Sequence, residues 1–153
     1  MSKSNFEMVK EFHKTFIKEK DPTTPTWPDD TDLTLRSDLI EEEWTELDKE
    51  LWEDPKKRDI VKVAKELVDL LYVVYGTAAK LGLPIDACFA EVHRSNMSKL
   101  GKDGLPVLRS DGKVLKGPNY SPADLSKLVK TSTTIKTDKK LEKKVENKNA
   151  TSS

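Results

Sequence analysis

Two stretches of the chain decide its fold: LIEEEWTELDKEL at residues 39–51 and RDIVKVAKELVDLLYVVYGTAAKL at residues 58–81. In both, apolar residues recur three and four positions apart, which is the period of an α-helix with one buried face. Pro55 lies between them and disfavours helix at the residue that precedes it, and Gly82 follows the second stretch as a left-handed cap. The pattern therefore predicts two long helices, over about 34–53 and 58–81.

Two further segments show the same period. Residues 4–19 place their apolar side chains on one face, and residues 84–100 begin with a proline in the favoured first turn. Short apolar runs on both sides of Ser110-Asp-Gly predict a small hairpin. We therefore expect an all-α, four-helix bundle-like domain over residues 1–125 with a small C-terminal hairpin, followed by a disordered Lys/Ser/Thr-rich tail over residues 126–153.

The acidic side chains of the two long helices do not all lie opposite the apolar face. On a helical wheel Glu43 falls between Leu39 and Leu47, and Asp69 lies where the third helix becomes apolar or small all round. A lone buried carboxylate is costly unless it is paired, protonated or bound to a metal. The simpler alternative is that the Glu41–Glu43 run forms a solvated acidic face.

The spacing of the acids favours a metal site. Glu43 and Glu46 lie three residues apart on one helix, and Glu66 and Asp69 lie three apart on the next. Residues at i and i+3 share a face, so two antiparallel helices can bring the four carboxylates around a common point. All-oxygen ligands without His or Cys suit hard cations, Mg²⁺ first and Mn²⁺ second.

The fourth helix carries side chains that suit an anion. Asn96 and Lys99 continue its apolar stripe at the C-terminal end, and Arg94 adds a further cation. A lysine at a core position favours a bound anion, with phosphate the obvious one. In the alternative interpretation Asn96 caps the helix and Lys99 extends into solvent.

The two acidic motifs, Glu42-Glu43-Trp44-Thr45-Glu46 and Glu66-Leu67-Val68-Asp69, resemble the E-E-x-x-E and E-x-x-D signature of MazG-like all-α nucleoside triphosphate pyrophosphohydrolases. The chain looks most similar to the phosphoribosyl-ATP pyrophosphohydrolase-like branch of that superfamily. The further motifs that carry this likeness are Phe12-His13-x-x-Phe16, Arg36-x-x-Leu-Ile-x-Glu-Glu, Glu66-Leu-Val-Asp-Leu-Leu-Tyr-x-x-Tyr-Gly76, Val92-His-Arg-Ser-Asn-Met-Ser-Lys99 and Asp111–Tyr120. The resemblance covers about residues 6–125 and implies a MazG-type arrangement of the four helices.

The resemblance also implies an activity: Mg²⁺-dependent cleavage of a (deoxy)nucleoside triphosphate between the α and β phosphates, giving a monophosphate and pyrophosphate. Glu42 would be a further ligand or would orient the attacking water, while Asn96, Lys99 and Arg94 would contact the substrate. Members assemble as homodimers or homotetramers, which the apolar second half of the third helix favours. The residues expected to hold the metal are Glu43, Glu46, Glu66 and Asp69.

Two aromatic side chains each allow two interpretations. His13 lies at the centre of the apolar face of the first helix, where it is either a core histidine with its hydrogen bonds made or a substrate contact. Tyr72 lies at the edge of the apolar arc of the third helix, where it either packs in the core or contacts a base or ribose. We include both among the candidate substrate-binding residues.

Charge and cysteine content exclude several other classes. The chain has 27 Lys+Arg and 27 Asp+Glu, so its net charge is zero, and the cancellation is between residues 30–54, which are acidic, and residues 94–153, which are basic. This argues against a uniformly basic nucleic-acid binder, although a Lys-rich tail is present. One cysteine permits no intrachain disulfide, and no signal peptide or long apolar run is evident, so we expect a cytoplasmic protein without membrane association.

The function alternatives fall into three classes: an enzyme, a non-catalytic binding module, and a nucleic-acid binder that uses the Lys-rich tail, which rests on charge alone. The chain is expected to hydrolyse a canonical or damaged nucleoside triphosphate, or phosphoribosyl-ATP, or to be a non-catalytic helical module that uses its acidic cluster to bind Mg²⁺ and its basic tail to bind a partner.

Overall fold

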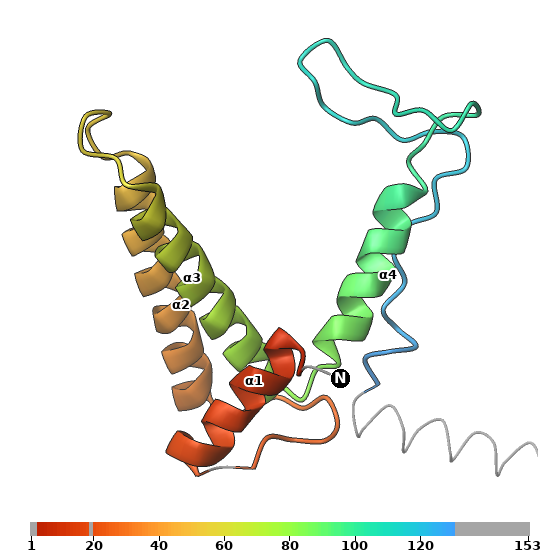
Figure 1. Ribbon diagram of the computed structural model, residues 1–153. Helices are drawn as coiled ribbons and strands as arrows, with labels where there is room; N and C mark the ends of the chain where they lie inside the picture. The colour runs from red at the N-terminus through yellow and green to blue at the C-terminus, as the bar shows by residue number, and fades with distance from the viewer. Residues whose placement is uncertain (1–2, 19, 131–153) are drawn as a thin grey trace, which may run out of the picture. The chain divides into compact units, whose positions relative to one another are not determined.

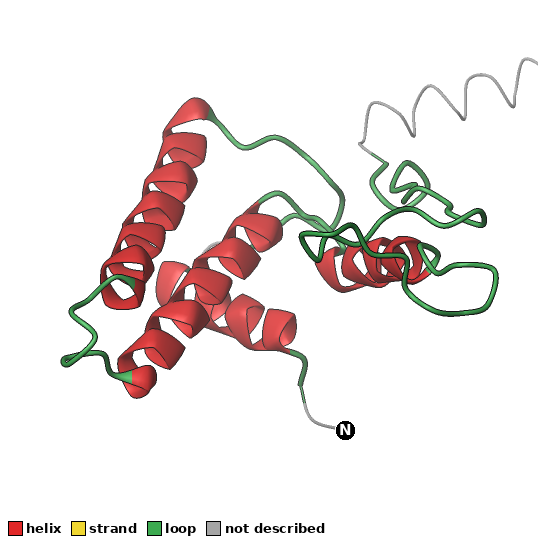
Figure 2. Cartoon of the chain, turned by 90° about the horizontal axis from the view of Figure 1, so that it is seen from above, coloured by secondary structure: helices red, strands yellow, loops and turns green. Residues whose placement is uncertain are grey.

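The computed structural model describes residues 3–18 and 20–130 and has four α-helices (Figure 1). Their bounds are Asn5–Phe12 for α1, Asp30–Leu51 for α2, Ile60–Lys80 for α3 and Ile85–Met97 for α4. Apart from a π-helical turn over His13–Ile17, the remainder of these described residues is loop and turn without a regular strand, as Figure 2 shows. The all-α prediction is confirmed. The described residues form two compact units, 3–83 and 84–130, and each is considered by itself.

The first helix is shorter than predicted because it widens after Phe12. Ser4 caps α1 by accepting a hydrogen bond from the Glu7 backbone N–H, while the Glu7 carboxylate accepts one from the Ser4 N–H. From His13 to Ile17 the chain continues as a π-helical turn. Such a turn adds one residue to the helical repeat, so the side chains after it rotate away from the original face. Phe16, which was expected on the apolar face, lies within this turn and is 69% exposed.

The second helix begins earlier than the predicted residue 34. Asp29 is its N-cap, and the Asp29 carboxylate accepts a hydrogen bond from the Asp32 backbone N–H at 2.8 Å. Helix α2 therefore starts at Asp30, inside the stretch that its prolines and threonines mark as a loop. The helix then runs antiparallel to α3 and beside it (Figure 1).

The third helix ends as the sequence predicts. Gly82 has φ +64°, a left-handed conformation, and its N–H donates to the Ala79 carbonyl. The end of α3 also holds the loop that precedes α2, because the Thr26 N–H donates to the Leu81 carbonyl at 3.0 Å. A Cβ at Gly82 would lie only 2.5 Å from the Thr24 carbonyl oxygen.

The core of the first unit lies where α1 and α2 pack on α3. Val9 of α1, Leu47 of α2 and the small Ala78 and Ala79 of α3 are buried there. Many larger apolar side chains of α2 and α3 stay exposed: Trp44, Leu51, Ile60, Val61, Leu67, Val68, Leu71 and Val74. The unit therefore leaves more apolar surface in contact with solvent than a monomeric domain usually does.

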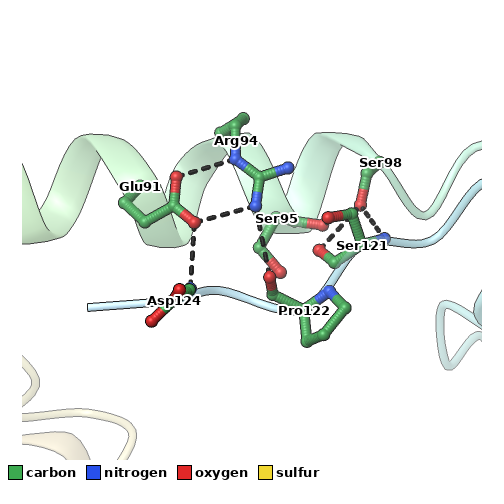
Figure 3. Close-up of polar contacts among 7 residues, drawn as sticks. All are labelled: Glu91, Arg94, Ser95, Ser98, Ser121, Pro122 and Asp124. Carbon is green, nitrogen blue, oxygen red and sulfur yellow. Dashed lines mark hydrogen bonds and ion pairs between the residues drawn. The ribbon is translucent and has the colours of Figure 1, made fainter. Parts of the chain in front are cut away.

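The second unit consists of α4 and a segment that returns along it. The Ser121 N–H donates to the Ser98 hydroxyl at 2.9 Å, and the Asp124 N–H donates to the Glu91 carboxylate at 3.0 Å (Figure 3). Arg94 links α4 to the returning segment, because its guanidinium donates to Glu91 and to the Pro122 carbonyl. Helix α4 ends at Met97, before the predicted residue 100.

The predicted hairpin is present as a single antiparallel bridge between Leu108 and Val114. The Arg109 N–H donates to the Lys113 carbonyl across the turn, and Gly112 takes φ +84°. Of the predicted disordered tail, the structure describes residues 126–130, which begin in a hydrogen-bonded turn, and the rest lies outside the described residues.

No single described helix is long and apolar enough to span a membrane.

Glu91 provides a pH-dependent test of the second unit. The Arg94 guanidinium and the Asp124 N–H lower the pKa of Glu91 from 4.5 to about 2. A carboxyl whose pKa is lowered on folding stabilises the fold above its unfolded pKa, and this contribution is lost as the pH falls from about 4.5 towards 2. We expect Glu91→Gln to lower the thermal midpoint at pH 7 and to reduce its fall between pH 5 and pH 2, compared with the exposed control Glu41→Gln. Parallel pH curves for the wild type and Glu91→Gln would contradict this.

Candidate metal centre

Three carboxylates from two helices converge in the first unit. Glu43 and Glu46 come from successive turns of α2 and Glu66 comes from α3, and one oxygen of each lies within 4.8 Å of the others. Glu66 is only 8% exposed, whereas the Glu46 side chain is 51% exposed, so the cluster is open to solvent on one side. We call these three residues the acidic triad.

Asp69 lies one turn beyond Glu66 on α3 and is linked to the triad through a lysine. The Lys65 Nζ lies 2.8 Å from the Asp69 carboxylate, 3.0 Å from that of Glu66 and 3.9 Å from that of Glu46. Sequence reasoning missed Lys65, although its i,i+4 spacing to Asp69 is a recognisable ion-pair signal. The lysine places a positive charge among the carboxylates.

The charge of the cluster is visible in the pKa values of its members. Burial raises the pKa of Glu43, and the negative charges of Asp69 and Glu46 raise it further. Hydrogen bonds to Asp69 and Glu66 raise the pKa of the Lys65 ammonium. Both shifts are in the direction expected where several carboxylates lie close together around one ammonium group.

The donor set fits a hard divalent cation. All the converging groups are carboxylate oxygens, which Mg²⁺ prefers, and the Lys65 ammonium already takes the place that a cation would favour among them. Glu43, Glu46 and Glu66 are the converging residues that would hold the metal, whereas Asp69, the fourth predicted ligand, is not in that group, so its role as a ligand stays a prediction. Glu42 is exposed and is not a member of the triad, so its role remains a prediction.

His13 and Tyr72 lie in the same unit as the triad. His13 is buried, and its Nδ1 lies 3.2 Å from the Asp21 carboxylate. Tyr72 packs edge-on against Phe12, with ring centroids 5.6 Å apart, and is still 37% exposed. His13 therefore has the satisfied hydrogen bond expected of a core histidine on one nitrogen, and the other nitrogen faces Gly76 of α3.

The three predicted anion-binding residues belong to the second unit: Arg94 and Asn96 lie on α4, whereas Lys99 lies just after the helix ends at Met97 and not on it as predicted. The Lys99 Nζ donates to the Asn96 side-chain oxygen at 2.7 Å, so the two act as a pair. Arg94 is committed to Glu91 and to the Pro122 carbonyl, as Figure 3 shows. Substrate contact by Asn96, Lys99 and Arg94 stays a prediction.

Residues 9–96 match the sequence signature of the family described as "Phosphoribosyl-ATP pyrophosphohydrolase". The chain belongs to the phosphoribosyl-ATP pyrophosphohydrolase family. That match spans more than half of the chain and includes His13, Asn96 and every residue of the triad. The predicted membership of the MazG-like superfamily and of this branch is therefore confirmed.

Two further comparisons place the family member among known proteins. It is similar to the crystal structure of a "putative NTP pyrophosphohydrolase" from Exiguobacterium sp. 255-15, with 22% identity, complete coverage of both chains and a TM-score of 0.41. Among curated proteins, no sequence matches this phosphoribosyl-ATP pyrophosphohydrolase family chain.

Lys65 allows a test of the metal centre of this family member. Replacing it by methionine removes a positive charge that competes with a divalent cation for Glu66 and Asp69. We expect Lys65→Met to strengthen Mg²⁺ and Mn²⁺ binding about three- to tenfold by isothermal titration calorimetry, since charges this close interact by kilocalories per mole at protein surfaces. Lys62→Met, an exposed lysine on the same helix, controls for net charge. Weaker binding in Lys65→Met would show that the lysine orders the ligands instead.

Proposed function

We propose that this chain is a Mg²⁺-dependent nucleotide pyrophosphohydrolase that cleaves a (deoxy)nucleoside triphosphate between the α and β phosphates. The observation that carries the proposal is the convergence of Glu43, Glu46 and Glu66 within 4.8 Å at a seam between two antiparallel helices. Family membership supports it, because the family is named for hydrolysis of a phosphoanhydride bond.

Each residue of the site would have its own role in the reaction. A bound Mg²⁺ would neutralise phosphate charge and lower the pKa of a coordinated water. The buried Glu66 holds its carboxylate in a fixed place, and the more exposed Glu46 leaves a side from which substrate can approach. Lys65 bridges the carboxylates of Glu66 and Asp69, at 3.0 and 2.8 Å. Glu42, the residue before Glu43, would be a further ligand or would orient the attacking water.

A substrate panel tests the proposal directly. Purified full-length protein is incubated with each of the common ribonucleoside and deoxyribonucleoside triphosphates, with oxidised nucleotides and with phosphoribosyl-ATP, and released pyrophosphate is measured. We expect turnover that needs Mg²⁺ or Mn²⁺ and stops with excess chelator. Turnover of phosphoribosyl-ATP alone would assign that substrate.

The non-catalytic alternative makes a different prediction in the same assay. A binding module would take up Mg²⁺ in calorimetry and release no pyrophosphate from any nucleotide with either metal. That pair of results would reject the enzyme proposal. A nucleic-acid-binding protein would instead lose salt-sensitive affinity for RNA or DNA when residues 131–153 are removed.

We also propose that the chain self-associates as a homodimer or homotetramer. The support is the set of large apolar side chains that α2 and α3 leave exposed, among them Val68 at 58% and Leu71 at 51%. Light scattering after size exclusion should give a mass of two or four chains for the wild type. A charge at an exposed apolar position, Val68→Asp, is expected to lower that mass without loss of helicity. A monomer at all concentrations tested would exclude the proposal.

A further inference from the structure

A second polar group lies at the seam between α2 and α3, away from the acidic triad. Arg36 of α2 has a fully buried Nε that makes no hydrogen bond, and no ion pair to Arg36 occurs within residues 3–18 and 20–130. A buried donor without an acceptor is costly, and such groups in native proteins usually have a functional explanation. Arg36 as a whole is partly exposed, and Nε is the one of its nitrogens that is both buried and without a partner.

The surroundings of Arg36 are arranged to let it lie against α3. A Cβ at Gly76 would come within 3.3 Å of the Arg36 Nη1 and within 3.1 Å of the His13 Nε2. Both contacts are tighter than ordinary van der Waals distances, so glycine leaves the space that the two side chains use. Because the His13 Nδ1 is taken by the Asp21 carboxylate, the free nitrogen of His13 is the one beside Arg36.

The register of the two helices relates this pair of side chains to the metal centre. Arg36 lies seven residues before Glu43 on α2, and Gly76 lies seven residues after Asp69 on α3. Because the helices run antiparallel, both counts lead in the same direction along the seam (Figure 1). At 1.5 Å per residue, the guanidinium side of the seam is about 10 Å from the carboxylates.

We propose that Arg36, with His13 beside it, binds an oxygen acceptor on the nucleoside part of the substrate and thereby helps to determine which nucleotide is accepted. This inference rests on the proposed function, in which the phosphates are held at the acidic triad. A nucleotide bound there by its phosphates along the seam extends its nucleoside towards Arg36. A guanidinium offers donors only, so it selects carbonyl or hydroxyl oxygens over amino groups.

Stability separates this role from a structural one. If Arg36 held the helices together, Arg36→Met would lower the melting temperature. If Arg36 serves a ligand, replacing it by a side chain without polar atoms removes the unpaired buried Nε, so the melting temperature stays equal or rises. Lys49→Met, an exposed cation on the same helix, is the matched control for lost charge.

Calorimetry with two kinds of ligand is the decisive experiment. The full-length wild type, Arg36→Met and Lys49→Met are titrated, in Mg²⁺, with the α,β-methylene analogues of UTP and GTP, whose bases carry carbonyl oxygens, and with inorganic triphosphate. We expect Arg36→Met to weaken binding of the nucleotide analogues about tenfold or more, which is what loss of a charged hydrogen bond gives. Its affinity for inorganic triphosphate, and all affinities of Lys49→Met, should match the wild type.

Three results would overturn the inference. In the first, Arg36→Met loses as much affinity for inorganic triphosphate as for the nucleotide analogues. In the second, Arg36→Met loses affinity for neither. In the third, the wild type binds the analogues no more tightly than it binds inorganic triphosphate. A protein that releases no pyrophosphate in the substrate panel but shows the expected loss in Arg36→Met would refute the proposed catalysis and leave the role of Arg36 standing.

Discussion

We expect Glu66→Gln to lower metal-dependent turnover by at least about 100-fold. This is the upper end of the loss in metal affinity or activity that usually follows mutation of a residue supporting a metal ligand. Glu66 is the least exposed member of the acidic triad, and its carboxylate lies within 4.8 Å of those of Glu43 and Glu46. Glutamine has the same shape but lacks the negative charge, so the effect isolates the electrostatic role of the residue.

The measurements for Glu66→Gln are pyrophosphate release and Mg²⁺ binding by calorimetry, with circular dichroism to verify folding. Glu41→Gln is the matched control, because Glu41 belongs to the same acidic run on α2 but is exposed and is not part of the triad. We expect Glu41→Gln to behave as the wild type. Wild-type metal binding and turnover in a folded Glu66→Gln protein would show that the triad is not the metal centre.

Gly82→Ala is expected to destabilise the protein by about 2–5 kcal/mol. Its φ of +64° imposes a left-handed conformation that costs a residue with a Cβ about 1–2 kcal/mol. The new Cβ would also lie 2.5 Å from the Thr24 carbonyl oxygen, and relief of such a clash costs about 1–3 kcal/mol more. The free energy of unfolding from urea titration measures the sum.

Two further variants separate the causes at Gly82. Gly82→Asn tolerates the left-handed conformation but keeps the clash with Thr24, so it should remain clearly destabilised. Gly104→Ala has a similar φ, +76°, with no atom within 4 Å of the new Cβ, so it should lose only the conformational part. If Gly82→Ala and Gly104→Ala cost the same, the close approach of the Thr24 loop to the end of α3 would be refuted.

Local signals determined much of the fold. The apolar period of residues 58–81 and the glycine that follows them are sufficient to predict α3 and its left-handed end, because both depend on interactions within a few residues. The start of α2 was placed too late, since a run of prolines and threonines masks the Asp29 cap. The widened turn at His13 has no sequence signal that we recognise, and neither has the exposure of Phe16 within it.

For the candidate site too, the sequence predicts one part and tertiary packing decides the other. The i,i+3 spacing of Glu43 with Glu46 and of Glu66 with Asp69 is enough to predict that acids share a helix face, because helical geometry is set locally. Which turn of α2 lies opposite which turn of α3 is a matter of packing between distant segments. Only that packing brings Glu43, Glu46 and Glu66 within 4.8 Å of one another.

The sequence by itself therefore determined the helical class, the acidic motifs and the family that they resemble. The tertiary structure alone decided that Lys65 lies among the carboxylates and that Arg36 and His13 meet at Gly76. Periodicity predicts the face on which a side chain lies, but the partner it finds there depends on the register between helices. That register is set by the volumes of many side chains packed together, and no short motif records it.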